Sequence, residues 1–211
     1  MQMQIFPNAT PVTRRVFVAG SVLALASFGT VARANTVIGK ALEVRGEVNR
    51  KQQESAEVLA AGGDVLDNDL IATGKDSFAS LQLGEDTSLL LGSETELLID
   101  SFIAGQGGTI ELGTGQVVFD RPEGLPKIDL SMRTAFGMIG VRGTKFFAGP
   151  NRGVFAVFVE HGLVEVTGGG VTREVGMGEG VEIAQPGAAP SEVTAWGQER
   201  INEAYASAGA R

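Results

Sequence analysis

The stretch Ala79-Ser80-Leu81-Gln82-Leu83 places a small or apolar side chain at every second position, with polar side chains between them. Side chains of a β-strand point alternately to opposite faces, so a period of two is typical of a strand with one buried face. The same alternation recurs in Ile110-Glu111-Leu112, Leu163-Val164-Glu165-Val166 and Val181-Glu182-Ile183. The pattern therefore predicts an all-β protein built of short, half-buried strands.

Two apolar runs do not alternate. They are Leu89-Leu90-Leu91 and Val154-Phe155-Ala156-Val157-Phe158-Val159. Strands that are apolar on both sides are typical of a sheet that is covered on both faces. We therefore expect a second layer over these two strands, in addition to the main core.

Glycine divides these runs at short intervals, and the chain contains 30 glycines. A glycine, one variable residue and an apolar residue recur from Gly46, Gly63, Gly115 and Gly162, and with one extra residue from Gly178. A repeated unit of short strands and tight turns cannot bury its apolar face alone and must stack on its neighbours. This predicts a β-solenoid or roll, with a β-sandwich as the alternative, because a sandwich has a similar sequence signature.

The tail, residues 189–211, has a different composition. Val193, Trp196, Ile201, Ala204 and Tyr205 fall roughly on one face of a helix. An open end of a β stack exposes strand edges that need a cover. We therefore expect a C-terminal helix that caps the end of the stack, with Trp196 as its anchor.

The N-terminus has the pattern of an export signal. Arg14 and Arg15 precede an uncharged stretch of small and apolar residues, 18–31, and Ala32-Arg33-Ala34 has the small-x-small form of a cleavage site. Paired arginines before a weakly hydrophobic stretch favour the twin-arginine route over the general secretory route. The predicted organisation is a signal peptide (1–34) cleaved after Ala34, a β domain (35–188) and the helical tail (189–211).

Charge and composition limit the class of partner. The signal segment contains three arginines and no acidic residue, so its removal changes the formal charge from −8 to −11. A domain with this negative charge repels nucleic-acid phosphates and anionic lipid. We therefore expect no nucleic-acid partner and no stable membrane insertion after cleavage. The chain has no cysteine, which excludes disulfides and thiolate chemistry. The expected location is the periplasm.

The sequence offers little catalytic chemistry. A nucleophilic triad needs a base, and the only histidine, His161, stands in a predicted turn beside Gly162. Paired carboxylates could serve a glycosidase, but the candidates Asp64, Asp67, Asp69, Glu85 and Asp86 all stand in predicted glycine-rich turns, where acids are usually solvated. We predict no catalytic residue, no cofactor and no enzyme activity.

One turn, Gly62-Gly63-Asp64-Val65-Leu66-Asp67-Asn68-Asp69, has the close-spaced acids that calcium prefers. It lacks the repeated pattern of known calcium-binding repeats. We therefore prefer hydrogen bonding within the turn by these side chains and predict no metal site, with calcium at Asp64, Asp67 and Asp69 as the open alternative.

The most specific stretch is Ile139-Gly140-Val141-Arg142-Gly143-Thr144, followed by Phe146. It resembles the GVRGT-x-F signature of the FecR-domain family. The segments Gly63–Gly74 and 160–166 resemble two further family motifs in the expected order, and the resemblance spans about residues 38–183. From the residues alone, Gly140, Val141, Arg142, Gly143 and Thr144 form a structural turn with positive φ, in which the Arg142 guanidinium bonds carbonyls or an acid inside the bend.

The resemblance implies a periplasmic, non-catalytic, β-rich domain, and the export signal favours a stand-alone exported form. The first expectation is an envelope binding or scaffold module whose partner is an envelope protein or a glycan, with an unknown ligand. The alternative is a regulatory sensor that relays an envelope signal to a membrane-bound anti-sigma partner.

Overall fold

The computed structural model describes residues 36–52 and 55–210, so the predicted signal peptide, with Arg14, Arg15 and the cleavage after Ala34, lies outside the described residues. The described part belongs to one unit, Asn35–Arg211. Its elements are β1 (Val37–Arg45), β2 (Val48–Gln52), β3 (Ser55–Val58), β4 (Asp64–Leu66), β5 (Leu70–Thr73), β6 (Phe78–Leu83), β7 (Thr87–Leu91), β8 (Glu96–Ile103), β9 (Gly107–Thr114), β10 (Val117–Asp120), β11 (Asp129–Thr134), β12 (Gly137–Val141), β13 (Lys145–Asn151), β14 (Val154–His161), β15 (Val164–Gly168), β16 (Val171–Val175), β17 (Glu179–Ile183), β18 (Thr194–Ala195) and α1 (Gln198–Ser207).

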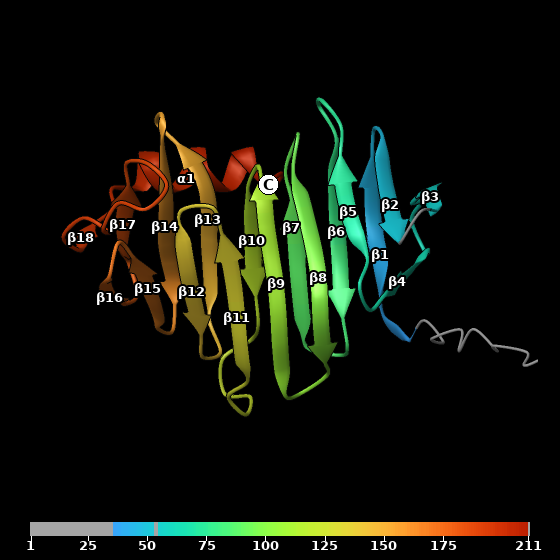
Figure 1. Ribbon diagram of the computed structural model, residues 1–211, viewed down its shortest axis with the longest axis horizontal. Helices are drawn as coiled ribbons and strands as arrows, with labels where there is room; N and C mark the ends of the chain where they lie inside the picture. The colour runs from blue at the N-terminus through green and yellow to red at the C-terminus, as the bar shows by residue number, and fades with distance from the viewer. Residues whose placement is uncertain (1–35, 53–54, 211) are drawn as a thin grey trace, which may run out of the picture. The chain divides into compact units, whose positions relative to one another are not determined.

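The strands form two nine-stranded sheets. Sheet A has the order β18-β17-β14-β13-β10-β7-β6-β1-β4, and sheet B has the order β16-β15-β12-β11-β9-β8-β5-β2-β3. In Figure 1 the two sheets form two layers, and the colour runs from blue to red in the same direction along both. The all-β prediction is confirmed.

The chain places one or two strands in one sheet and then crosses to the other. Hairpins such as β6–β7, β8–β9 and β13–β14 make the neighbouring strands antiparallel, and among the described strands the pair β9–β11 is the parallel one. Stacked solenoid rungs would instead pair in parallel along each sheet. The solenoid prediction is therefore not confirmed, and the sandwich alternative fits the two sheets equally well.

The main core lies between the two sheets. The side chains that point inward from sheet A include Leu81, Leu89 and Phe119. Those from sheet B include Ile110 and Ile139, and each of the five is at most 1% exposed. The intervening Ser80 and Gln82 of β6 are half-buried, as the alternation predicts. Burial of the apolar side chains between the layers is the main source of stability, at roughly 25 cal/mol per Å².

A second apolar cluster lies on the outer face of sheet A. Val118, Phe147, Ala156 and Phe158 point away from the main core and pack against Ala204 of α1 and its neighbours. Strand β14 is therefore covered on both faces, as its continuous apolar run predicts. In β7, Leu90 takes part only at the edge of this cluster.

The C-terminal helix is present, but the prediction that it caps the end of the stack is wrong. Helix α1 packs across the outer face of sheet A (Figure 1). Trp196 anchors it as expected, because the residue is only 8% exposed and its ring stacks on Phe158 with 5.0 Å between the ring centroids. The apolar face of the helix covers the apolar row on β10, β13 and β14, which gives it more area to bury than a strand edge would. No helix in residues 36–52 and 55–210 is long and apolar enough to cross a membrane.

Candidate binding surfaces

The Gly140–Thr144 stretch carries the chain from sheet B to sheet A. Gly140 and Val141 end β12, and Lys145 begins β13. Gly143 has φ +70°, a conformation that favours glycine, whereas Gly140 stays in the extended region of the strand. Thr144 is fully buried. Arg142 points outward with 62% of its side chain exposed, and its partner is Glu165 of the adjacent strand β15, at 3.3 Å, and not an acid inside the bend.

The acidic turn uses its carboxylates for separate protein contacts. Asp64 pairs with Lys40 at 2.9 Å. An Asp67 oxygen accepts from the Phe102 amide at 3.2 Å, and an Asp69 oxygen accepts from the Leu66 amide at 2.8 Å. In the described residues no group of three or more acidic, histidine or cysteine side chains is placed to hold a metal ion. The Asp69 contact is the hydrogen bonding within the turn that the sequence predicts, whereas the named contacts of Asp64 and Asp67 go to residues outside the turn.

Asp69 is fully buried, and burial raises the pKa of its carboxyl above the ordinary value of 3.8. The folded protein therefore loses stability as the pH rises from 3.8 through the raised pKa, because the buried group must then ionise. We expect Asp69→Asn, whose amide oxygen still accepts from the Leu66 amide, to gain thermal stability relative to the native chain as the pH rises from about 4 to 7. Melting temperatures across this range measure the difference.

The matched control is Asp64→Asn, because the hydrogen bond and charge of Lys40 lower the pKa of this exposed carboxyl. Its pair is formed above the ordinary pKa and is lost as the pH falls, so the native chain should gain relative to this variant as the pH rises. Parallel pH profiles for Asp69→Asn and the native chain would contradict the assignment.

His161 ends β14, with 18% of its side chain exposed. Its ring nitrogens lie 3.9 Å from an Asp120 oxygen and 3.7 Å from a Glu123 oxygen, beyond hydrogen-bond distance. Within residues 36–52 and 55–210, no hydroxyl group forms a hydrogen bond with it. This geometry offers no activated nucleophile. His161 is the last residue of β14 and not the turn residue that the sequence predicts.

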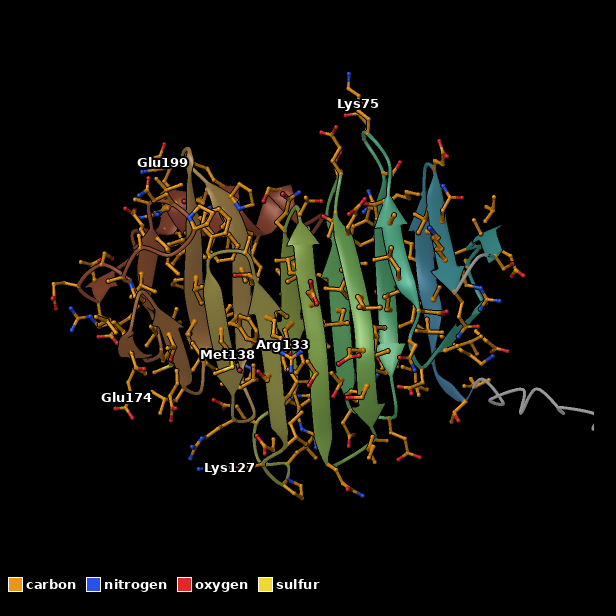
Figure 2. The ribbon with its side chains drawn as sticks, in the orientation of Figure 1. Lys75, Lys127, Arg133, Met138, Glu174 and Glu199 are labelled. Atoms are coloured by element: carbon orange, nitrogen blue, oxygen red, sulfur yellow. The ribbon has the colours of Figure 1, made fainter. Side chains whose placement is uncertain are left out.

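The outer face of sheet B is uncovered at its centre, because α1 lies on sheet A. There Glu111, Arg133, Met138 and Thr167 are register neighbours on β9, β11, β12 and β15. Met138 is 47% exposed, and the Arg133 side chain is exposed and has no hydrogen bond or ion pair with any described residue. Figure 2 shows Arg133 and Met138 close together near the middle of the sheet. We call this surface the open face.

The outer face of sheet A has a pocket at each end of α1. Beside the start of the helix lies a pocket of about 420 Å³, lined by Phe158, Glu160, Met177, Gly178, Gln198, Ile201, Asn202 and Tyr205. Burial, and next the Glu160 carboxylate, raise the pKa of the Tyr205 phenol above its ordinary value, so the phenol is neutral at physiological pH.

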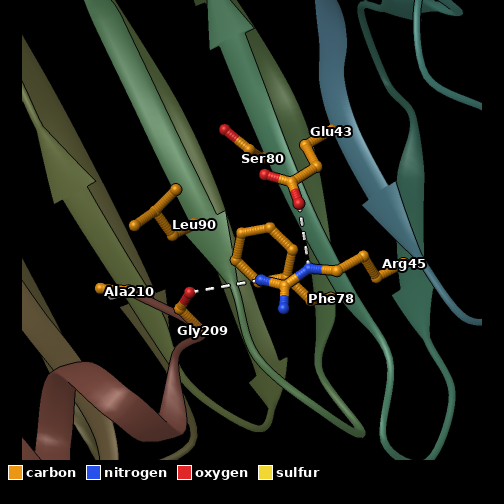
Figure 3. Close-up of a pocket in the computed structure, with 7 residues that line it drawn as sticks. All are labelled: Glu43, Arg45, Phe78, Ser80, Leu90, Gly209 and Ala210. Carbon is orange, nitrogen blue, oxygen red and sulfur yellow. Dashed lines mark hydrogen bonds and ion pairs between the residues drawn. The ribbon is translucent and has the colours of Figure 1, made fainter.

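Figure 3 shows the second pocket, of about 220 Å³, where the chain leaves the helix. The Arg45 guanidinium lies over the Phe78 ring, 4.3 Å from its centroid. Glu43 pairs with it at 3.1 Å, and the Gly209 carbonyl accepts from it at 3.4 Å. Arg45 thus has three partners, and one of these contacts joins the end of the chain to the sheet.

Sequence reasoning missed the open face. The alternation in Leu130-Ser131-Met132-Arg133 indicates that Arg133 points away from the core, but not that the face it points to stays uncovered. That depends on which sheet α1 covers, and only the fold shows this.

The fold and these surfaces define a two-layer β protein with one covered and one open outer face. A family model described as "FecR protein" matches residues 69–165, a narrower span than the resemblance suggested. Residues 69–165 therefore match a FecR domain, as the resemblance predicts. This domain runs from the residue before β5 into β15 and includes the Gly140–Thr144 stretch and the centre of the open face.

No curated protein matches the sequence. Two crystal structures of a proposed anti-sigma factor from Parabacteroides distasonis ATCC 8503 have a similar fold. The chain is 19% and 18% identical to them, with TM-scores of 0.51 and 0.52. Each match covers 63% of this chain and 62% of the other chain, so the similarity spans less than two thirds of those proteins and shows the fold alone.

Proposed function

We propose that this protein is a non-catalytic regulatory module of the cell envelope that relays a signal to a membrane-bound anti-sigma partner. The observation that carries the proposal is the FecR domain at residues 69–165, whose strands build the open face. The fold shared with a proposed anti-sigma factor supports the same class. The export signal, with Arg14 and Arg15 and cleavage after Ala34, belongs to the proposal, and so does a periplasmic location.

The open face supplies the surface for such a partner. The exposed Arg133 side chain, which has no hydrogen bond or ion pair with the part of the chain that the structure describes, lies beside the exposed Met138. Glu111 lies on the other side of the arginine. Methionine adapts its shape to an apolar partner surface, and arginine donates in a planar fork that fits a carboxylate. The partner segment therefore presents an acidic side chain next to an apolar one.

A second function is supported by the pocket of about 420 Å³ beside α1. Glu160, Gln198 and Asn202 supply hydrogen-bonding groups around the aromatic rings of Phe158 and Tyr205. Donors and acceptors arranged around an aromatic ring suit a sugar, so this pocket favours an envelope binding or scaffold module that takes a glycan.

A deletion strain tests the two functions together. We expect deletion to change the transcript levels of an operon that depends on a sigma factor, and the native gene to restore them. The double variant Arg133→Gln/Met138→Ala should fail to restore them. Lys75→Gln/Met177→Ala is the matched control, because it also removes one exposed cation without a side-chain partner in the described residues and one exposed methionine, away from the open face.

Unchanged transcripts in the deletion strain would remove the regulatory proposal. Failure of the control with restoration by the open-face variant would favour the pocket beside α1, which Met177 lines. Circular dichroism of both variants checks that they keep the β fold.

A further inference from the structure

A third pocket, of about 270 Å³, lies where the β6–β7 and β8–β9 turns meet. Gly84, Glu85 and Asp86 line it from the first turn, and Ala104 and Gly105 line it from the second. The turns are in contact, since a side chain added at Gly84 would come within 2.9 Å of the Ala104 Cβ. Arg121, which directly follows β10, forms another part of the lining.

Arg121 is 2% exposed, yet its guanidinium is poorly satisfied. It donates to the Thr87 hydroxyl and to the Pro126 carbonyl, each at 3.3 Å, and both acceptors are neutral. Its nearest carboxylate oxygen, on Asp86, lies 3.9 Å away, and its Nε has no partner among the described residues. Charge-assisted bonds are typically about 2.7–2.9 Å long, and a buried cation without a close anion is costly.

The mouth of the same pocket is acidic. Glu85 is exposed and Asp86 is partly exposed. A simple anion would be attracted by Arg121 but repelled by these two carboxylates. A simple cation would be attracted by the carboxylates but repelled by Arg121. A molecule with a carboxylate and an ammonium group a few bonds apart satisfies both parts of the pocket.

We propose that this pocket binds the zwitterion of a small α-amino acid. The carboxylate lies at Arg121, and the ammonium group lies between Glu85 and Asp86. The volume is just below the range of roughly 300–1,000 Å³ typical of drug-sized ligands, which fits a molecule of this size. This pocket lies apart from the open face. The amino-acid proposal can therefore be tested separately from the proposed anti-sigma partner.

The test is a titration of the isotopically labelled full-length chain, followed by NMR. L-alanine is expected to shift the amide signals of residues 84–87 and 104–105. Propionate, which lacks the ammonium group, and L-alaninamide, which lacks the carboxylate, should each bind at least about tenfold more weakly, since each loses one charged contact. Equal binding of propionate, or no shift at these residues with L-alanine, would overturn the proposal.

Variants at the mouth keep the test independent of the buried arginine, whose replacement endangers folding. In Glu85→Gln/Asp86→Asn we expect L-alanine to bind about tenfold more weakly and propionate to bind more tightly than in the native chain, because the repulsion is gone. Glu174→Gln, an exposed acid on β16, is the control and should leave both affinities unchanged. Equal weakening of both ligands, or no change, would contradict the assigned role of the two acids.

Discussion

Replacing Phe146 with alanine is expected to lower the free energy of unfolding by about 3–5 kcal/mol. Its ring is fully buried between the sheets and stacks on Phe119, with 5.4 Å between the ring centroids. Both residues lie in the centre of sheet A, opposite each other on β10 and β13. The surrounding strands are fixed by their ladders, so they cannot move in to fill the space, and the cavity term adds to the lost burial.

Denaturant unfolding followed by circular dichroism measures this loss. Leu163→Ala is the control, because Leu163 is 38% exposed and should cost less than about 1 kcal/mol. A loss at Phe146 no larger than that of the control would mean that the two sheets do not enclose one continuous core.

Gly180→Ala is expected to destabilise the protein by about 1–3 kcal/mol and to release the helix from sheet A. A Cβ at this position would lie 2.4 Å from the Trp196 Nε1 and 2.7 Å from the Val157 carbonyl oxygen. Trp196 is the only tryptophan in the chain, so its fluorescence reports directly on this contact. The emission should move to longer wavelength as the ring enters water.

Gly178→Ala provides the comparison. It has φ +79° with no atom within 4 Å of the added Cβ, so only backbone strain of roughly 1–2 kcal/mol is expected, with no change in tryptophan emission. Native-like emission from Gly180→Ala would show that Trp196 does not hold the helix on the sheet.

The alternation of apolar and polar residues was enough to predict several of the strands and the face that each of them buries. In β6, Ala79, Leu81 and Leu83 are buried as their spacing requires. The continuous run at residues 154–159 also predicted a cover on both faces of β14. The sequence did not show that α1 is that cover. The apolar stripe of a helix indicates how much apolar surface the helix buries, but not which surface of the protein it packs against.

The order of the strands was harder to predict. Glycine turns of similar length connect strands both in solenoid rungs and in sandwich hairpins. The local sequence therefore cannot distinguish a solenoid from a sandwich. The parallel pair β9–β11 illustrates this, since it depends on β10 crossing to sheet A between them. Arg121 was missed for a related reason, because a lone arginine after a strand gives no sign that two distant turns will enclose it.

The FecR domain leaves its own apolar row on sheet A to be covered from outside the matched span. Val118, Phe147 and Phe158 lie within residues 69–165, whereas Trp196 and α1, which cover them, do not. The helix thus covers the middle of one outer face, and the proposed anti-sigma partner contacts the open face of sheet B.

Site-specific photo-crosslinking in cells tests that claim most directly. A photoreactive amino acid in place of Met138, at the centre of the open face, should form a covalent adduct with a membrane-bound protein that carries an anti-sigma segment, identified by mass spectrometry. The same group in place of Glu199, exposed on α1, should form no such adduct. An adduct with that protein from position 199 and none from position 138 would contradict the account.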